Sequence, residues 1–244
     1  MMNERFAEIW VYLSASPLLG LTITLLAYQA AVWLHQRCNG HPLANPVMMS
    51  IVFLVSILLI SDTPYHVYFD GAKFVHFLLG PATVALAIPL HAQFSKLVKL
   101  ALPLLLSLIC GSLTAALSAV MLGKALGASQ ITLMSLAPKS VTSPIAMGIA
   151  ERIGGLPSLT SVLVVLTGVI GSVGAQTIFN KIRCSDPVTT GFPLGVAAHG
   201  IGTARAFQMS EETGAFAALA MGLNGFLSAI LLPWIMPLLA RWLF

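Results

Sequence analysis

Long apolar runs separated by short polar stretches dominate the chain. A helix that crosses a bilayer needs about 20 mostly apolar residues, and most of these runs approach or exceed that length. The runs cover residues 9–34, 47–61, 74–92, 99–123, 157–180 and 213–240. Two further apolar stretches, 131–150 and 192–208, are interrupted by proline, glycine and charged residues. The pattern predicts an all-α fold, a polytopic transmembrane bundle of about 6–8 membrane segments with broken or re-entrant helices.

Composition favours a membrane protein over a soluble one. Of the 244 residues, 57% are hydrophobic and 8% are charged, whereas a soluble domain carries about a quarter charged residues. This number of charges is too small to build a water-facing surface. We therefore expect the lipid bilayer to be the outer solvent. The N-terminus lacks the composition of an organelle transit peptide, and the first run is too long for a signal-peptide core. We therefore expect residues 1–244 to form a single integral membrane domain in a bacterial inner membrane.

The basic residues predict an orientation and no nucleic-acid partner. The formal net charge is +4, but Lys and Arg occur singly or in pairs and form no continuous basic face. The basic loops contain Arg37, Lys96, Lys99, Lys181 and Arg183, and we predict them on the cytoplasmic side. The stretch 61–73, with two aspartates and several aromatic residues, is then expected as an outer loop at headgroup level. On that topology 131–150 is expected to be a re-entrant hairpin.

Irregular backbone at membrane depth has to be buried in protein or line a watery cavity, because lipid satisfies no N–H or C=O group. The first irregular segment, 78–91, contains Pro81, Pro89 and the hydroxyl of Thr83. An ordinary kinked helix is the alternative, since proline is common in membrane spans. GPATVA at 80–85 shares a pattern with APKSVT at 137–142, which indicates either an inverted repeat or chance.

The second irregular segment lies between Pro138 and Pro144, and contains Lys139, Ser140, Thr142 and Ser143. Proline removes a backbone donor and disfavours helix before it, so we predict that this segment is unwound. A lysine at membrane depth costs about 2.5–3.5 kcal/mol on insertion scales and needs an anionic partner or water. An ammonium group among three hydroxyls predicts an anion site. The alternative is that the lysine extends to the membrane interface.

The third irregular segment, 195–208, is rich in glycine and offers His199, Thr203 and Arg205 as hydrogen-bond donors. At helical spacing His199 and Thr203 are four residues apart and are expected to share one face. Arg205 has the planar group that grips a carboxylate with two parallel bonds. The alternative for His199 is an ordinary packing residue with a satisfied ring.

The carboxylates fall at predicted ends and loops, and none lies in mid-span. They are Glu4, Glu8, Asp62, Asp70, Glu151, Asp186, Glu211 and Glu212. A cation exchanger normally keeps a carboxylate in its pathway, so cationic groups without acidic partners favour an anionic passenger. Cation coupling through backbone carbonyls or His199 stays open. Asn224, Asn45, Gln176 and Asn180 are lesser candidates, for which hydrogen bonding between helices is the default.

Neither catalysis nor metal binding is expected. Lys139 beside Ser140 has the composition of a nucleophile pair, but adjacent helical residues do not face one another. Cys38, Cys110 and Cys184 lie far apart without metal-ligand spacing. We therefore predict no enzyme activity, no metal site and no cofactor.

Three motifs resemble the LrgB/CidB family, and the likeness covers nearly the whole chain. They are PATVALAIPL at 81–90, PKSVTSPIAM at 138–147, and AAHGIGTARAF with the later GAFAALAM at 197–221. Bacterial relatives in this family are described as antiholin-like or holin-like proteins that modulate murein hydrolase activity and lysis, often with a smaller LrgA/CidA-type membrane partner. A related plant chloroplast protein exchanges glycolate and glycerate, and some bacterial pairs are implicated in pyruvate uptake.

The resemblance thus implies two competing functions, a carrier and a lysis regulator. A carrier for small organic monocarboxylates explains the broken helices and the cations at depth, with proton coupling through His199 as an option. The positions expected to line its pathway are Pro81, Thr83, Lys139, Ser140, Thr142, Ser143, His199, Thr203 and Arg205. Small-residue runs at 111–119 and 168–175 serve helix packing, within one chain or in a homo-oligomer.

Overall fold

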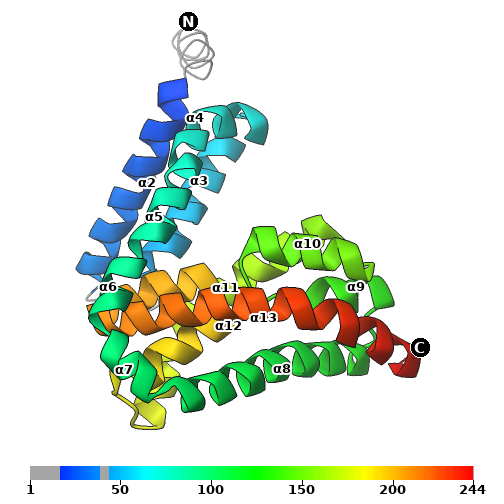
Figure 1. Ribbon diagram of the computed structural model, residues 1–244. Coiled ribbons are helices and arrows are strands. Elements are labelled where there is room, and N and C mark those ends of the chain that lie inside the picture. Colours follow the sequence, from blue (N-terminus) through cyan, green and yellow to red (C-terminus); the bar gives the residue numbers. More distant parts are fainter. Residues whose placement is uncertain (1–16, 39–43, 244) are drawn as a thin grey trace, which may run out of the picture. The chain divides into compact units, whose positions relative to one another are not determined.

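The computed structural model describes residues 17–38 and 44–243 (Figure 1), and all regular elements in these ranges are helices. This confirms the predicted all-α class. By contacts the chain divides into two compact units, Met1–Ala85 and Leu86–Phe244, each of which is described by itself. The expectation of a single membrane domain stays a prediction.

The first unit is built around a long helix that packs against two of its neighbours. Its helices are α2 (Pro17–Arg37), α3 (Pro46–Ile60), α4 (Tyr65–Phe77) and α5 (Leu79–Ala85), with α2 in contact with α3 and α4. Asn45 begins α3, because its Oδ1 accepts from the backbone N–H groups of Val47 (3.0 Å) and Met48 (3.2 Å). α2 and α4 approach closely at Gly20, where a Cβ atom would lie 2.5 Å from the carbonyl oxygen of Tyr68.

The expected outer loop at 61–73 is wrong from Tyr65 onward, where α4 begins. Two contacts stabilise this helix: the rings of Tyr65 and Phe69 stack with centroids 5.6 Å apart, and Lys73 pairs with Asp70 at 3.3 Å. Both contacts join residues three or four apart, which lie on one face only in a helix. The polar composition of the stretch concealed this spacing.

The single span expected at 74–92 is divided among α4, α5 and α6 (Ala87–Ala92). Pro81 and Pro89 each stand at the third position of a short helix. A proline costs little there, because the first N–H groups of a helix have no partner within it.

Four helices in the described residues are long and apolar enough to cross a membrane, or five segments if the bent pair 65–75 and 80–92 is one span. The four are α2, α8 (Ala101–Ala125), α11 (Pro157–Lys181) and α13 (Glu211–Leu243). They correspond to predicted runs, although the start of the first run lies outside the described residues. Large apolar side chains remain exposed on them, such as Ile170 and Phe226. An apolar surface of this kind suits lipid.

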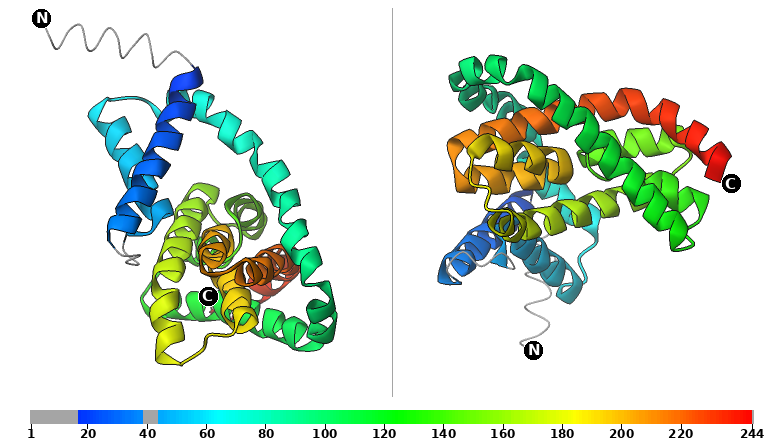
Figure 2. Two further views of the ribbon diagram at one scale, coloured as in Figure 1. Left: turned by 90° about the vertical axis from the view of Figure 1, so that its left-hand side faces the viewer. Right: turned by 90° about the horizontal axis from the view of Figure 1, so that it is seen from below.

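In the second unit, α6, α7 (Phe94–Lys99) and α8 are followed by two short helices, α9 (Gln130–Leu136) and α10 (Ser143–Ile153). After these come α11, α12 (Pro187–Met209) and α13. α13 runs the length of this unit, and α8 lies along it (Figure 1). Seen from below, α8 crosses α12 and α13, and it contacts both (Figure 2).

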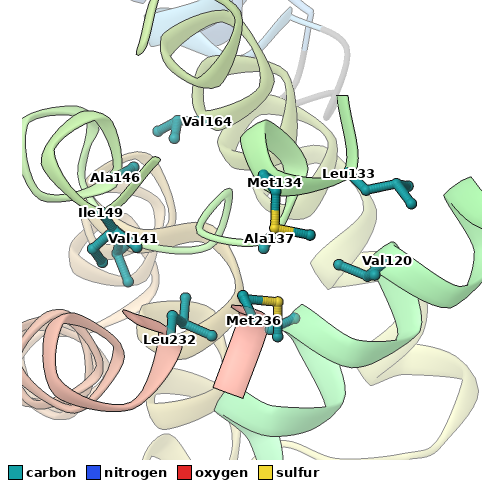
Figure 3. Close-up of a cluster of buried hydrophobic side chains, with 11 residues drawn as sticks. Val120, Leu133, Met134, Ala137, Val141, Ala146, Ile149, Val164, Leu232 and Met236 are labelled. Atoms are coloured by element: carbon teal, nitrogen blue, oxygen red, sulfur yellow. The ribbon is translucent and has the colours of Figure 1, made fainter. Parts of the chain in front are cut away.

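Three long helices of the second unit each bury a stripe of residues spaced mostly four apart, which is one helix face. The stripes are Leu104, Leu108, Ser112, Ala116 and Val120 on α8; Thr160, Val164, Gly168 and Ser172 on α11; and Asn224, Ser228, Leu232 and Met236 on α13. Apolar side chains from α8, α9, α10, α11 and α13 meet in one buried cluster around the segment between α9 and α10 (Figure 3).

α12 and α13 make the most extensive contact between two helices, and glycine permits it. A Cβ atom at Gly191 would collide with the carbonyl oxygen of Thr213, and one at Gly195 with that of Ala217. Small residues four apart let two backbones approach in this way. The first part of α12 is therefore fixed against α13.

Candidate functional site

The chain is unwound between α9 and α10, as the two prolines predict. α9 ends at Leu136, residues 137–142 form turns, and α10 begins at Ser143. The start of α11 contacts the end of α9, because the N–H of Leu156, the residue before α11, donates to Ser135 Oγ (2.8 Å) and Thr160 Oγ1 donates to the carbonyl of Ser135 (3.0 Å). The re-entrant hairpin expected at 131–150 stays a prediction.

Lys139 lies deep in the second unit. Its ammonium donates to the carbonyl of Ala115 in α8 (3.2 Å) and to Ser140 Oγ (3.2 Å). Ala115 lies near the middle of α8, about 20 Å along the axis from Ala101 and about 15 Å from Ala125. This depth argues against a lysine that extends to the interface. Within residues 17–38 and 44–243, no carboxylate pairs with it.

A second break lies inside α12, at His199. Its φ of 41° and ψ of −132° are not helical, although the residues on both sides are. A Cβ atom at Gly202 would lie 2.5 Å from the carbonyl oxygen of Leu194, whereas residues eight apart in a straight helix are separated by about 12 Å. The contact shows that α12 bends sharply. Sequence analysis expected an irregular segment here but did not identify the residue at which it breaks.

The side chains of His199 and Thr203 point to different helices, so the expectation that they share one face is wrong. His199 Nε2 bonds to the carbonyl of Val164 in α11 (2.9 Å), and a Cβ atom at Gly168 would lie 2.7 Å from the ring. Thr203 Oγ1 donates to the backbone carbonyl of His199 (2.9 Å) and contacts Met221 Sδ of α13 (3.8 Å). The positive φ turns His199 out of the helical register on which the expectation rested.

The two breaks meet at Asn224 in α13. Its Nδ2 donates to the carbonyl of Ser140 (3.1 Å) and to the carbonyl of Val196 (3.0 Å), and the residue is 1% exposed. Val196 precedes the bend at His199, where carbonyl groups lose their helical partners. Sequence analysis ranked Asn224 as a lesser candidate. The signal for a larger role was an amide in the middle of an apolar run.

A row of polar groups continues from Asn224 toward α8. Ser228 Oγ lies 3.5 Å from Asn224 Oδ1 and 3.3 Å from Ser112 Oγ. A cavity of about 10 Å³ lies among these groups, lined by Ser112, Ala116, Ala137, Pro138, Ser140, Val141, Asn224, Ser228 and Leu232. One water molecule needs about 10–15 Å³. The site is therefore closed, and a carboxylate enters it only if the helices move.

The remaining predicted residues lie further out. Thr142 precedes α10 without a capping hydrogen bond from its hydroxyl, and Ser143 begins that helix. Arg205 is half-buried in the second part of α12, where its Nη1 donates to Gln208 Oε1 (3.1 Å). Among the described residues, Arg205 thus hydrogen-bonds within its own helix and not to Lys139. The structure brings together Lys139 and Ser140, and it does not bring Arg205 to them.

Pro81 and Thr83 belong to the first unit, so their part in the site stays a prediction. Pro81 is exposed in α5, while only the backbone of Thr83 is described and its side chain lies outside the described part. Residues 80–85 all lie in α5, whereas 137–142 are unwound. The similar patterns of the two segments therefore do not correspond to similar local structures.

A larger cavity of about 430 Å³ lies between α7, α8 and the start of α12, with mainly apolar walls. Lys96 on its rim donates to Glu212 Oε1 (2.7 Å), and this hydrogen bond raises the pKa of Lys96. Asp186, also on the rim, begins α12 by accepting from the N–H groups of Val188 (3.1 Å) and Thr189 (3.0 Å). The bond from Thr189 is the largest cause of the lowered pKa of Asp186. Asp186 in its wall, together with the pairing of Lys96 to Glu212, makes this cavity a poor anion site.

No group of three or more His, Cys, Asp or Glu side chains in the described ranges could hold a metal ion. The groups at the centre are one ammonium group, hydroxyls, an amide and backbone carbonyls that accept from Lys139 and Asn224. Such groups bind and orient a small polar molecule. Lys139 Nζ lies 3.2 Å from Ser140 Oγ, so the expectation that these adjacent side chains do not face one another is wrong, because the segment is not helical. The absence of enzyme activity stays a prediction.

These features define a class, a multi-pass α-helical membrane protein with two interrupted helices that meet at the centre of one unit. The model of the LrgB-like family matches residues 24–238, and the chain belongs to this family. The family prediction from the three motifs is thereby confirmed.

Individual relatives match over nearly their full length. The chain is 34% identical to the uncharacterized protein YwbG of Bacillus subtilis over 219 residues, which is 90% of this chain and 97% of that protein. It is 31% identical to antiholin-like protein LrgB of Bacillus cereus over 222 residues, 91% of this chain and 96% of the relative. The antiholin-like protein LrgB of Bacillus anthracis gives the same values. No solved structure matches the chain.

Proposed function

We propose that this protein carries small organic monocarboxylates, of the size of pyruvate, glycolate or glycerate, across a bacterial inner membrane. The observation that supports this proposal most is the ammonium group of Lys139, which lies beside the middle of α8 and whose hydrogen bonds among the described residues go to neutral oxygens of Ala115 and Ser140. A charge in that position is expensive unless water or a counter-ion joins it. A passenger carboxylate supplies the missing negative charge when the site opens.

The interrupted helices support the same proposal. Discontinuous helices near the bilayer midplane are the usual binding elements of secondary transporters, because their ends expose backbone groups to the passenger. Here the unwound segment between α9 and α10 and the part of α12 before its bend both bond to Asn224. Alternating access then requires the small closed cavity to open to one side at a time. Arg205 enters the site only in such an opened form.

The second candidate is an antiholin-like regulator of murein hydrolase activity and lysis, and the printed names of the relatives from Bacillus cereus and Bacillus anthracis favour it. The two functions are compatible, because altered carboxylate flux changes membrane energetics. A regulator acting through assembly alone needs no lysine at mid-depth. Under either function the chain works alone, as a homo-oligomer, or with a smaller LrgA/CidA-type membrane protein.

The test is uptake of labelled pyruvate, glycolate and lactate into liposomes that contain the purified protein, with and without a pH gradient. We expect saturable uptake that Lys139→Ala and Arg205→Ala abolish, while Lys181→Ala, at the exposed end of α11, serves as a matched control. Near-normal uptake in both test variants would reject this site.

Size-graded dye leakage without saturation would favour a pore over a carrier. Absence of uptake both with and without the smaller partner, together with altered murein hydrolase activity in cells, would favour the regulator. Stimulation of uptake by a pH gradient would add proton coupling, for which His199 is the residue to substitute first.

A further inference from the structure

Asn224 is the one side chain in the described part of the chain that bonds to both interrupted segments. Its single amide nitrogen reaches Ser140 in the segment between α9 and α10, and Val196 before the bend in α12. These two residues are 56 positions apart in the sequence. We propose that Asn224 is a positioning residue that locks the two breaks together and keeps the passenger site closed. The proposal rests on the proposed function and names how its site is held.

The chemistry of the contact requires an amide. Both acceptors are backbone carbonyls at points where helical hydrogen bonding stops, so each needs a donor from elsewhere. An amide nitrogen carries two N–H groups and serves both at once. A carboxylate offers no donor when ionised and one when protonated, and a hydroxyl offers one. Of the uncharged side chains, only Asn and Gln place two donors on one nitrogen.

The helices beside Asn224 are closely packed. Next to Asn224, a Cβ atom at Gly225 would lie 2.8 Å from Ile145 Cδ1 of α10. On the facing helix, a Cβ atom at Gly111 would lie 3.3 Å from Val196 Cγ1. The adjoining cavity of about 10 Å³ is at the lower limit for one water molecule. Water therefore does not readily replace the amide in the closed form.

The contact also connects the breaks to the candidate anion site. Ser140 accepts from Asn224 through its backbone carbonyl and from Lys139 through its side-chain oxygen (3.2 Å). Moving the Ser140 backbone therefore moves the partner of the ammonium group. The two segments separate only if one of the two hydrogen bonds from Asn224 Nδ2 breaks. Asn224 is thus placed to couple opening of the site to the position of Lys139.

The experiment compares Asn224→Asp, Asn224→Gln and Asn224→Leu with Ser172→Ala as a matched control. Ser172 is as deeply buried, at 2% exposure, and its hydroxyl donates to the carbonyl of Val169 in its own helix, α11 (3.0 Å), and to neither break. Single cysteines are introduced as Val141→Cys or Ala198→Cys in a chain whose three native cysteines are replaced by serine; both positions are buried, at 2% and 0% exposure. The rate of labelling by a water-soluble maleimide in liposomes then reports opening of each break.

We expect labelling at both positions to be at least tenfold faster in Asn224→Asp and Asn224→Leu than in the parent, and unchanged in Ser172→Ala. Asn224→Gln keeps both donors and should stay closer to the parent than Asn224→Asp. Packing alone predicts the opposite order, because Asp has nearly the shape of Asn and Gln is larger. The proposal would be overturned if the labelling rate of Asn224→Asp equalled that of the parent, or if Asn224→Gln were labelled faster than Asn224→Asp.

Uptake supplies a second measurement. We expect KM for the carboxylate to fall severalfold in Asn224→Leu, because the open form that admits the passenger is more populated before binding. Melting temperature and size-exclusion profile in detergent identify variants that fail to fold. If Asn224→Leu fails to fold, the comparison of Asn224→Asp with Asn224→Gln decides the role of Asn224. If the parent protein transports nothing, the proposed function fails, while the labelling rates still decide the role of Asn224.

Discussion

The two breaks are chemically different, although Asn224 joins them. The break between α9 and α10 covers six residues, 137–142, and is bracketed by Pro138 and Pro144. The break in α12 is one residue, His199, with no proline beside it. The first is imposed by the chain itself, because proline removes donors and disfavours helix before it. The second depends on neighbours, which supply the space at Gly168 and the carbonyl of Val164.

This difference means that the two breaks should respond differently to substitution. A break encoded by proline survives loss of individual packing contacts, whereas a break held by packing fails when its contacts fail. If the bend at His199 persisted after its contacts with α11 were removed, the two breaks would not differ in this way.

The largest effect is expected where α12 meets α13. Gly195→Val places a side chain against the carbonyl oxygen of Ala217, a backbone atom that cannot move aside. We expect a loss of more than about 3 kcal/mol of stability, at the upper end of overpacking effects, and little folded protein on size-exclusion chromatography in detergent.

Gly148→Ala is the matched control in α10, where a Cβ atom meets nothing within 4 Å. We expect it to raise stability by up to about 1 kcal/mol, because alanine favours helix over glycine. Equal yields of folded protein from Gly195→Val and Gly148→Ala would show that the α12–α13 contact is looser than described.

The next effect concerns the charge at the first break. Lys139→Met removes a cation that is held by neutral oxygens, so we expect equal or higher thermal stability, by up to about 3 kcal/mol. The same variant should lose saturable uptake. Higher stability combined with lost uptake marks a functional group. A fall in melting temperature without a change in uptake would instead make Lys139 a structural residue.

The strained backbone at His199 sharpens the comparison. His199→Val puts a β-branched residue at φ 41°, and we expect it to cost about 1–3 kcal/mol in strain besides the lost hydrogen bond to Val164. His199→Gly loses the same hydrogen bond without the strain, so it should unfold at a higher temperature than His199→Val.

Pro138→Ala supplies the counterpart in the first break and should cost about 1 kcal/mol or less. Thermal unfolding in detergent ranks the three variants. A larger effect from Pro138→Ala than from His199→Val would reverse the comparison between a break made by proline and one made by packing.

The smallest effect concerns Asp186, in the loop before α12. Asp186→Ala removes its capping hydrogen bonds and should cost about 1 kcal/mol, while Asp186→Asn retains most of the cap. Because the pKa of Asp186 is lowered in the folded protein, its contribution is present above the unfolded pKa of about 3.9 and is lost as the pH falls through the lower folded value. Melting temperatures measured between neutral and acid pH should therefore fall less in Asp186→Asn than in the parent.

The sequence by itself determined the helical class, the positions of the long apolar helices and the unwound segment between Pro138 and Pro144. Each of these depends on groups close together in the chain: runs of apolar side chains that favour lipid, and prolines without an N–H group. The motifs also sufficed to identify the LrgB-like family. Local chemistry acts whatever the rest of the chain does, which is why these predictions succeeded.

Only the tertiary structure decided the bend at His199, the separate directions of His199 and Thr203, and the role of Asn224. A positive φ at a histidine is unfavourable locally and exists because α11 leaves space and offers a carbonyl. Asn224 bonds to groups 84 and 28 residues away, and no pattern of neighbouring residues indicates such partners. The energy of these features comes from contacts between distant segments, so they arise only once the helices have packed.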